Sequence, residues 1–268
     1  MRISSHRTQL RRVTATDSRE QGRSHPAGYG DVVYDRVRDS YDRVAVRYAD
    51  EIGAELAGKP VDRALLKCLV ELVSTVEETT GSGGVADLGC GPGHVAAFLA
   101  TLGVPTTGID ISSAMVEVGR KRYPDVHFRV GSLLALLATD AEHAGAIALY
   151  SIIHLQPEDR PSAYLEMSRV IRPGGWLLLA FHISLAGHEP GEIMHAEERW
   201  GEQVDLDFYY LDPAEVIEGL TSAGFVLMAR TDREHWPGAE HESRRCYLLC
   251  RRSPEAASEH LGAASAHA

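Results

Sequence analysis

Hydrophobic and polar residues follow two different periods along this chain. Apolar residues three and four positions apart run through residues 34–52 and 61–77 and predict two amphipathic helices. One face of the first helix carries Val37, Tyr41, Val44 and Tyr48. Because both helices precede the first strand, we expect residues 31–80 to form a helical cap.

Short apolar runs closed by glycine or polar residues predict buried strands. In chain order they cover residues 84–88, 106–110, 126–130, 146–151, 176–182, 225–230 and 245–250. Helical spacing between them covers residues 92–101, 113–122, 160–171 and 212–223, with Pro92 suited to a first turn. Strands that alternate with helices predict a parallel sheet covered on both faces, and the last two strands are close enough to form an antiparallel pair.

The two ends and one long connection lack this regular alternation. Residues 1–30 and 253–268 have little apolar content, so we expect a flexible leader and a disordered tail around a single domain of residues 31–252. Residues 183–211 form a longer connection than an ordinary αβ loop. A solvated amphipathic helix is expected near Glu192–Trp200 within it.

Composition narrows the choice of partners. The chain has 268 residues, 44% of them hydrophobic, which is enough for one core, and its formal net charge of −11 disfavours nucleic acid as a partner. It has no apolar run of membrane-spanning length and no secretory signal, so we expect no membrane partner. The four cysteines form no CxxC pair and favour a reduced, cytoplasmic protein. The sequence leaves open whether the protein is a monomer or a homodimer.

Residues 85–93 (VADLGCGPG) join a predicted strand to a predicted helix through three glycines. A strand that turns at once into a helix, with a ligand across the turn, requires residues without Cβ. Asp110 ends the next strand about 20 residues later, where a carboxylate can accept both hydroxyls of a ribose. This combination predicts a nucleoside site. The alternative is an ordinary tight turn beside an exposed aspartate.

The residue after the loop helps to choose the nucleoside. A dinucleotide fingerprint has a third glycine at the position of His94, whereas the pattern D-x-G-x-G-x-G, starting at Asp87, resembles class I S-adenosylmethionine-dependent methyltransferases. The resemblance covers residues 34–251. It implies a Rossmann-like sheet of seven mostly parallel strands with an antiparallel last strand, helices on both faces and an N-terminal helical cap. It also implies S-adenosyl-L-methionine as the cofactor.

The same resemblance assigns roles along the loop edges. Asp87 orients the methionine end, Asp110 holds the ribose, Ile111 flanks the adenine and the segment after Tyr150 lies between cofactor and acceptor. Ser132 stands where the family commonly has an aspartate, so its contact with the adenine amino group is expected to be weaker. The residues implied to bind the cofactor are Asp87, Gly89, Cys90, Gly91, Gly93, Asp110, Ile111, Met115, Ser132, Leu133, Tyr150 and Ser151.

Three residues are candidates for catalysis: His154, His182 and Tyr41. His154 follows the fourth strand at the carboxyl edge of the sheet, where it can act as a base; the alternative is a structural histidine bonded to a carbonyl group. His182, at the end of the fifth strand, is a second candidate base. Tyr41 can contact the cofactor carboxylate or the acceptor, or belong to an apolar stripe. The His and Glu residues of 183–211 match no metal-ligand spacing, so we assign no metal.

The function expected from these features is methyl transfer to O, N or C of a small organic molecule, such as a natural-product intermediate. The resemblance implies that residues 183–211 shape the acceptor pocket. Two alternatives remain open: a nicotinamide-dependent oxidoreductase, and a catalytically inert S-adenosylmethionine-binding or scaffolding protein.

Replacement of Asp110 by alanine tests the nucleoside site. We expect the affinity for S-adenosylmethionine to fall by roughly tenfold or more, because two hydrogen bonds to a charged group are lost. Isothermal titration calorimetry measures the affinities for S-adenosylmethionine and for NAD, and so distinguishes a methyltransferase cofactor site from a dinucleotide site. Unchanged affinity in the variant, or saturable binding of NAD alone, contradicts the prediction.

Overall fold

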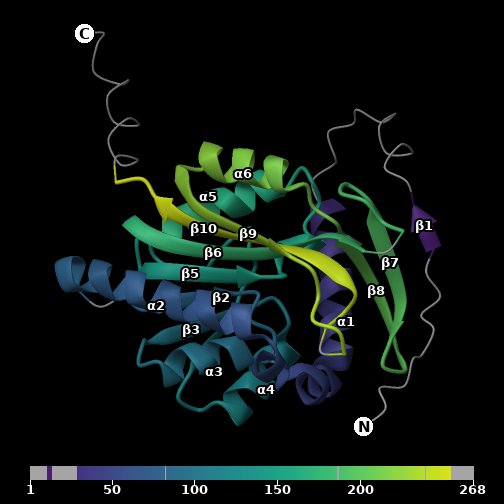
Figure 1. Ribbon diagram of the computed structural model, residues 1–268. Helices are drawn as coiled ribbons and strands as arrows, with labels where there is room; N and C mark the ends of the chain where they lie inside the picture. The colour runs from purple at the N-terminus through teal and green to yellow at the C-terminus, as the bar shows by residue number, and fades with distance from the viewer. Residues whose placement is uncertain (1–10, 14–28, 82, 186, 239, 255–268) are drawn as a thin grey trace, which may run out of the picture.

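The computed structural model of this chain describes residues 11–13, 29–81, 83–185, 187–238 and 240–254. A seven-stranded sheet with the order β4-β3-β2-β5-β6-β10-β9 lies at its centre (Figure 1). Its strands are β2 (Val85–Leu88), β3 (Thr106–Asp110), β4 (His127–Val130), β5 (His143–Leu149), β6 (Ile171–Leu185), β9 (Phe225–Arg233) and β10 (Ser243–Arg252). β10 alone runs opposite to the other six strands, which confirms the predicted fold class.

Helices cover both faces of this sheet (Figure 1). They are α2 (Pro60–Thr80), α3 (His94–Thr101), α4 (Ser113–Arg122), α5 (Arg160–Val170) and α6 (Pro213–Ser222). Because alternate residues of a strand point to opposite faces, Leu177 and Leu179 of β6 join the core under α5 and α6, while Leu178 joins the core under α2 and α3. The long apolar run of β6 is therefore buried on both sides, as is typical of a central strand.

The cap consists of α1 (Tyr29–Ile52), which lies across the carboxyl edge of the sheet between α4 and strand β8 (Glu202–Tyr209). Asp42 of α1 accepts hydrogen bonds from the hydroxyl of Ser112 at 2.6 Å and from the backbone N–H of Ala114 at 3.0 Å. On the other side, the hydroxyl of Ser40 accepts a bond of 2.9 Å from the N–H of Asp205. Both anchors hold α1 against the edge where the glycine loop lies.

The expected helix near Glu192–Trp200 is wrong, because this segment forms strand β7 (Ile193–Arg199). β7 and β8 make a hairpin whose two-residue turn, Trp200-Gly201, has φ angles of 52° and 87°. Positive φ at both turn residues matches the twist of paired strands, and Gly201 takes this conformation without strain. The charges at helical spacing concealed this turn.

The hairpin extends into a second sheet of three strands, with the order β1-β7-β8. β1 (Arg11–Val13) pairs with β7 and falls inside the range expected to be a flexible leader. The rest of that leader, except for the start of α1, and the expected disordered tail from residue 255 on lie outside the described residues.

Two predicted element boundaries also shift. α3 begins at His94 instead of in the turn with Pro92, because Gly93 has a φ of 83° and caps the helix from a left-handed conformation. β6 begins at Ile171, directly after α5, so the turn-like sequence 172–175 belongs to a strand with an irregular register toward β5.

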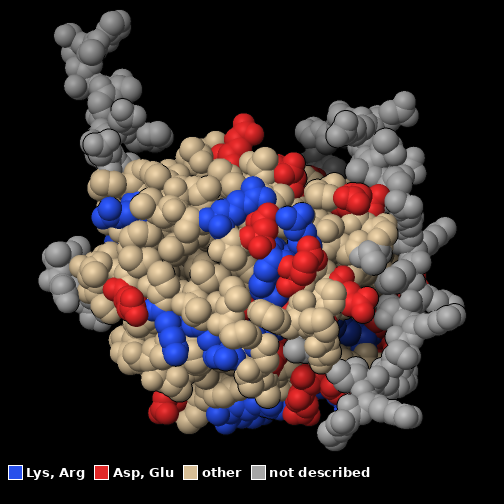
Figure 2. Space-filling view, in the orientation of Figure 1, with Lys and Arg blue, Asp and Glu red and all other residues tan. Residues whose placement is uncertain are grey.

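The surface shows where the charge lies. On the face seen in Figure 2, basic and acidic side chains are mixed. Ion pairs such as Arg230–Asp232 and Arg244–Asp232 join opposite charges on β9 and β10. The net negative charge is therefore not gathered into one acidic patch on this face. No helix within the described part of the chain has the length and hydrophobicity needed to cross a membrane.

The ring of Phe128, on β4, supports the glycine loop from behind. A Cβ atom added to Gly93 would lie 2.3 Å from this ring, and one added to Gly108 or Gly119 would lie 2.8 Å from it. Since real Cβ atoms do not approach so closely, three glycines from the loop, β3 and α4 create the space that Phe128 fills. The position of the loop depends on this packing.

Replacement of Gly119 by alanine tests that packing. Alanine is favoured over glycine inside a helix by about 1 kcal/mol, yet we expect a loss of about 1–3 kcal/mol because the new methyl group meets the ring of Phe128. Urea unfolding measures the difference. In a Phe128→Leu background the cost of Gly119→Ala is expected to shrink, whereas additive effects of the two substitutions contradict the packing argument.

Candidate functional site

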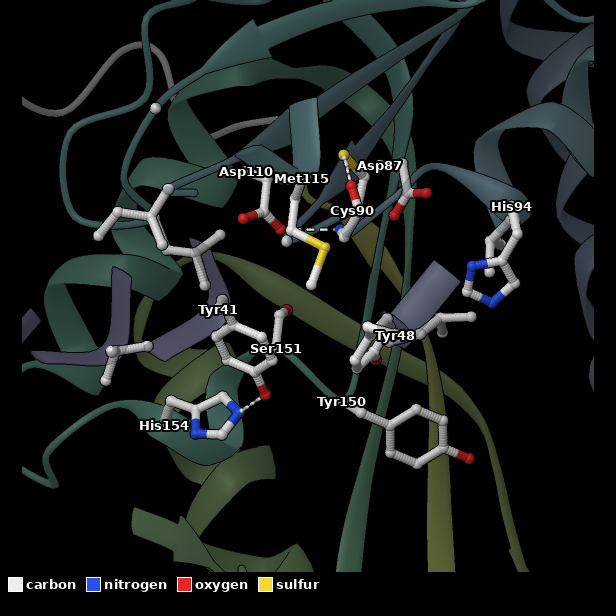
Figure 3. A pocket seen from close by; sticks show the side chains of 18 of the residues that line it. Tyr41, Tyr48, Asp87, Cys90, His94, Asp110, Met115, Tyr150, Ser151 and His154 are labelled. Atoms are coloured by element: carbon white, nitrogen blue, oxygen red, sulfur yellow. Dashed lines mark hydrogen bonds between the residues drawn. The ribbon is translucent and has the colours of Figure 1, made fainter. Parts of the chain in front are cut away.

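A pocket opens at the carboxyl edge of the sheet, between α1, the glycine loop and the segments that follow β3, β4 and β5 (Figure 3). All residues predicted for the site line this pocket except Gly93 and His182. The lining residues that were predicted are Tyr41, Asp87, Gly89, Cys90, Gly91, Asp110, Ile111, Met115, Ser132, Leu133, Tyr150, Ser151 and His154. Sequence positions more than 110 apart thus meet around one cavity, and their roles in binding and catalysis stay predictions.

Gly89 brings the glycine loop into contact with the loop after β5. Its φ is 75°, and a Cβ at this position would lie 2.3 Å from the Cβ of Ser151. Its N–H donates to the carbonyl of Ile109 at 2.8 Å, so the turn is fixed to β3 as well. The loop is therefore pressed against the neighbouring segments, and the wall that it presents to the pocket is mostly backbone.

Asp110 is held at the end of β3 by two backbone donors. One carboxylate oxygen accepts from the N–H of Ser112 at 2.9 Å and the other from the N–H of Gly91 at 2.8 Å. Burial raises the pKa of this carboxyl to about 6, although the two hydrogen bonds oppose the rise. Each oxygen keeps a second acceptor position, which is the chemistry needed for a pair of ribose hydroxyls.

Asp87 is the more strongly desolvated of the two carboxyls, with only 2% of its surface exposed. One of its oxygens, Oδ2, has no hydrogen-bond partner among the described residues. Burial, and secondarily the charge of Asp110, raise the pKa of Asp87 to about 7, against a bond from the N–H of Ala96. A buried acceptor without a donor fits the cationic methionine end of the predicted cofactor.

Apolar residues line the pocket beyond Asp110. Ile111 and Leu133 line it, and Met115 is 1% exposed. Ser132 lies where the family has an aspartate, and its hydroxyl accepts from the N–H of Leu134 at 3.2 Å. The hydroxyl thus already accepts a bond within its own turn, and the weaker adenine contact expected from the sequence stays a prediction.

Tyr150 follows β5 in a conformation that costs energy. Its φ is 58°, a left-handed value that side chains other than glycine rarely adopt. Its N–H donates to the carbonyl of Ala180 at 2.8 Å, its hydroxyl contacts that of Tyr247 at 2.8 Å, and its ring stacks on His182 at 4.7 Å. These contacts hold the ring in the pocket wall and turn the chain toward Ser151.

Tyr41 and His154 form a pair across the pocket, from α1 and the 3₁₀ helix η3 (Ile152–His154) (Figure 3). His154 Nδ1 lies 2.8 Å from the carbonyl of Asp207, which can only accept, so Nδ1 carries the proton. Nε2 therefore accepts from the hydroxyl of Tyr41 at 2.7 Å. Burial lowers the pKa of His154 to about 4, which keeps this ring neutral at physiological pH. The ring therefore bonds a carbonyl, as the structural alternative expects, and also lines the pocket, while its role as a base stays a prediction.

His182 does not line the pocket. Its Nδ1 lies 2.8 Å from the hydroxyl of Ser243, and its ring lies behind Tyr150. Burial, with the charge of Arg245 second, lowers its pKa well below the ordinary value, so the ring is neutral. In this arrangement His182 supports Tyr150, and any action on an acceptor would pass through that ring.

The pocket also contains residues that the sequence did not predict. Tyr34, Glu55, Asp62 and His94 all line it. His94 directly follows the glycine loop, and this position could have identified it as a pocket residue. In the sequence it indicated only that the third glycine of a dinucleotide fingerprint is absent. Glu55 comes from the segment between α1 and α2 and Asp62 from the first turn of α2. The path of this part of the chain across the pocket has no sequence signature.

Comparison with known proteins supports a methyltransferase. Residues 85–175 match a family model described as a methyltransferase domain. An O-methyltransferase of Penicillium expansum is 36% identical over 155 residues, covering 55% of this chain and 54% of the relative. A ubiquinone biosynthesis O-methyltransferase of Xanthomonas axonopodis pv. citri is 28% identical over 70% of this chain and 80% of its own length. The chain spans about half the length of several curated relatives that it matches.

Solved structures extend the likeness to the fold. An S-adenosylmethionine-dependent methyltransferase of Methanosarcina mazei has a TM-score of 0.57 at 19% identity, covering 64% of this chain and 92% of its own. A 1,6-didemethyltoxoflavin-N1-methyltransferase of Burkholderia thailandensis has a TM-score of 0.56 at 17% identity, covering 94% and 98%. At these identities the likeness concerns the fold alone.

Replacement of Asp87 by asparagine tests whether ionisation of this buried carboxyl destabilises the ligand-free fold. A carboxyl whose folded pKa is raised stabilises the fold below its unfolded pKa, and that contribution is lost as the pH rises to about 7. We therefore expect ligand-free Asp87→Asn to melt at a higher temperature than wild type at pH 8, with a smaller difference at pH 5. Asp125→Asn, at an exposed carboxylate, serves as the control. A pH-independent difference contradicts the assignment.

Proposed function

From the place of this chain among the class I S-adenosylmethionine-dependent methyltransferases, we propose that it methylates a hydroxyl oxygen of a small, neutral and largely apolar molecule. The observation that carries this proposal is the Tyr41–His154 pair, whose hydroxyl and imidazole meet at 2.7 Å in a buried wall of the pocket. The pair offers a path for the proton that a hydroxyl must lose when it is methylated.

S-adenosylmethionine supplies a methyl group that is already activated by its sulfonium. The residues of this chain then have to bind, orient and exclude water. Asp110 is suited to the ribose hydroxyls and Asp87 to the cationic end, and both are buried. α1 covers this edge and is fixed by Asp42, so closure of the pocket and assembly of the nucleoside site depend on the same helix.

The lining of the pocket favours a neutral acceptor. None of its described residues is lysine or arginine, whereas four are carboxylic acids: Glu55, Asp62, Asp87 and Asp110. Rings and aliphatic side chains make up much of the remaining wall, including Tyr34, Val37, Leu149 and Leu155. An acceptor that carried a phosphate or carboxylate would lose its hydration without gaining a cationic partner. A flat, hydroxylated ring system finds matching surfaces on Tyr41 and Tyr150.

The proton path follows from the tautomer of His154. Because Tyr41 donates its proton to Nε2, its oxygen has lone pairs free to accept from the acceptor hydroxyl. As the acceptor oxygen forms its bond to the methyl carbon and the carbon–sulfur bond breaks, its proton passes to Tyr41 and the proton of Tyr41 passes to Nε2. Asp207 holds the ring for this transfer through its carbonyl. His154 is the base, and Tyr41 contacts the acceptor.

The relatives support oxygen as the methylated atom, since several of them carry the name O-methyltransferase. The Burkholderia structure acts on a nitrogen according to its name, so nitrogen is the competing outcome. A cytoplasmic location, the absence of a nucleic-acid partner and a monomeric or homodimeric state stay predictions from the sequence.

Release of S-adenosylhomocysteine tests the proposal. Purified chain with S-adenosylmethionine is incubated with matched pairs of phenols that differ only by a carboxylate, and mass spectrometry locates the added methyl group. We expect O-methylation of neutral members and at least about tenfold slower turnover of their carboxylated partners. Binding of the cofactor without transfer across a broad panel supports an inert binding protein, and preference for the anionic members contradicts the pocket argument.

His154→Asn and Tyr41→Phe test the proton path. Asparagine can keep a donor for the carbonyl of Asp207 but has no counterpart of Nε2, and phenylalanine removes the hydroxyl alone. We expect each to lower kcat by roughly 100-fold or more, with cofactor affinity within about twofold. Because the pKa of His154 is about 4, kcat is not expected to fall through protonation of this ring between pH 6 and 9.

Tyr210→Phe is the matched control, because the hydroxyl of this tyrosine donates to the sulfur of Met194 and its side chain does not line the pocket. Wild-type kcat in His154→Asn eliminates the base assignment. A loss of cofactor affinity that equals the loss of kcat assigns the pair a structural role instead.

A further inference from the structure

His94 has one satisfied and one unsatisfied ring nitrogen at the edge of the pocket. Its side chain is 9% exposed, and Nε2 lies 3.2 Å from a carboxylate oxygen of Glu55. Since a carboxylate only accepts, Nε2 carries a proton. Nδ1 is buried and has no hydrogen-bond partner among the described residues. A buried polar atom that lines a pocket without a partner indicates that the pocket is completed by a ligand.

The position of His94 points to one end of the cofactor. Figure 3 shows Asp110 and His94 on opposite sides of the pocket, with Asp87 between them. With the ribose at Asp110 and the cationic end at Asp87, as proposed above, the amino-acid end would lie on the side of His94. His94 is also the first residue of α3, whose N-terminus has no side-chain cap and favours negative charge.

We propose that His94 binds the α-carboxylate of S-adenosylmethionine through Nδ1, at the N-terminus of α3. The inference rests on the proposed function, because it concerns the same cofactor. The two unsatisfied atoms are complementary to the two charges of an amino acid: Asp87 Oδ2 accepts from the ammonium group, and His94 Nδ1–H donates to the carboxylate. Because Nε2 already donates to Glu55, this contact requires a proton on Nδ1 as well, so that the ring donates to one carboxylate on each side.

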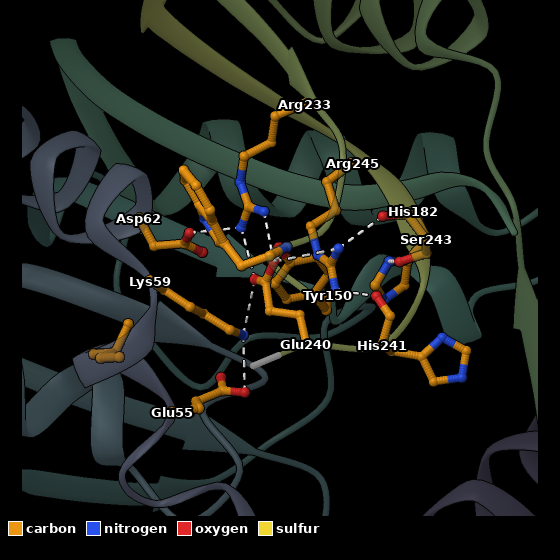
Figure 4. A network of polar contacts seen from close by, with 12 residues as sticks. Glu55, Lys59, Asp62, Tyr150, His182, Arg233, Glu240, His241, Ser243 and Arg245 are labelled. Carbon is orange, nitrogen blue, oxygen red and sulfur yellow. Dashed lines mark hydrogen bonds and ion pairs between the residues drawn. The ribbon is translucent and has the colours of Figure 1, made fainter. Parts of the chain in front are cut away.

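Glu55 is the positioning residue for this ring. Its carboxylate lies 2.8 Å from the ammonium of Lys59, and Lys59 in turn lies 3.7 Å from Glu240 (Figure 4). Burial raises the pKa of Glu55, but the bonds and charges of His94 and Lys59 lower it further, so the group stays ionised. Arg233 holds Glu240 through two bonds of 2.6 and 2.7 Å. This chain of ion pairs fixes the plane of His94 from the side away from the cofactor.

Three ligands distinguish the contribution of the carboxylate to binding from that of the rest of the cofactor. S-adenosylmethionine carries it, decarboxylated S-adenosylmethionine lacks only this group, and 5′-methylthioadenosine lacks the whole amino-acid end. Their dissociation constants are measured by calorimetry for the full chain and for His94→Gln and His94→Asn. Glutamine keeps a polar group near Nε2 and loses Nδ1, whereas asparagine keeps a donor near Nδ1 and loses the contact with Glu55.

In wild type we expect decarboxylated S-adenosylmethionine to bind roughly tenfold or more weakly than S-adenosylmethionine. In His94→Gln this ratio is expected to fall to about one, and in His94→Asn to recover in part. The affinity for 5′-methylthioadenosine is expected to stay within about twofold in all three proteins, which also shows that the variants are folded. Introduced into the wild-type protein, Glu55→Gln is expected to reduce this ratio. Introduced into the His94→Gln variant, it is expected to leave the ratio unchanged.

A ratio in His94→Gln equal to that of wild type overturns the inference while leaving the proposed function intact. A wild-type ratio near one also overturns the inference. This measurement requires no variant, so it remains possible if a substitution prevents folding. Equal losses for all three ligands assign His94 a structural role and also overturn the inference. Wild-type protein that binds none of the three ligands contradicts the proposed function itself.

Discussion

Two buried carboxylates without a cation impose the main constraint on this molecule. Asp87 and Asp110 lie at the ends of adjacent strands, are 2% and 9% exposed, and each has a pKa raised by burial. Ligand-free protein bears the electrostatic cost of this arrangement, because neither group is ion-paired among the described residues. In the proposed function, a cationic nucleoside offsets this cost when it binds. The features around the pair either bring the carboxylates together or keep water away from them.

The glycine loop and the cap meet this constraint from opposite sides. Behind the loop, Phe128 fills a space that exists only because Gly93, Gly108 and Gly119 lack Cβ atoms. In front of it, α1 is anchored through Asp42 to the start of α4, two residues from Asp110. The same helix carries Tyr41 to His154. A change that loosens α1 is therefore expected to affect the predicted nucleoside site and the proposed proton path together.

Charge is distributed unevenly around the pocket. The described lining has acids and no lysine or arginine, while the cations Lys59, Arg233 and Arg245 lie one layer behind it (Figure 4). There they neutralise Glu55, Asp62 and Glu240 and hold them in place. This arrangement lets the pocket keep polar groups of defined orientation without offering an anionic acceptor a direct partner. The proposed selectivity for neutral acceptors rests on this absence of lysine and arginine from the described lining.

The sequence by itself determined the sheet, because alternation of apolar runs with helical stretches leaves few ways to bury every strand. It also determined the glycine loop, since the requirement for missing Cβ atoms is visible at Gly89, Gly91 and Gly93. Features of this kind depend on consecutive residues and can therefore be recognised in the sequence. The β7–β8 hairpin was not predicted, because its turn, Trp200-Gly201, is only two residues long and its charged residues have the spacing of a helix.

Only the tertiary structure decided which distant side chains share the pocket. No spacing in the chain relates Tyr41 to His154 or Glu55 to His94, because these pairs form where α1 and the segment after it cross the sheet edge. The same contacts decided protonation: burial sets the charge of Asp87 and His154, and a single carbonyl of Asp207 selects the tautomer of His154. Burial and partners are properties of the fold, and a residue type alone does not carry them.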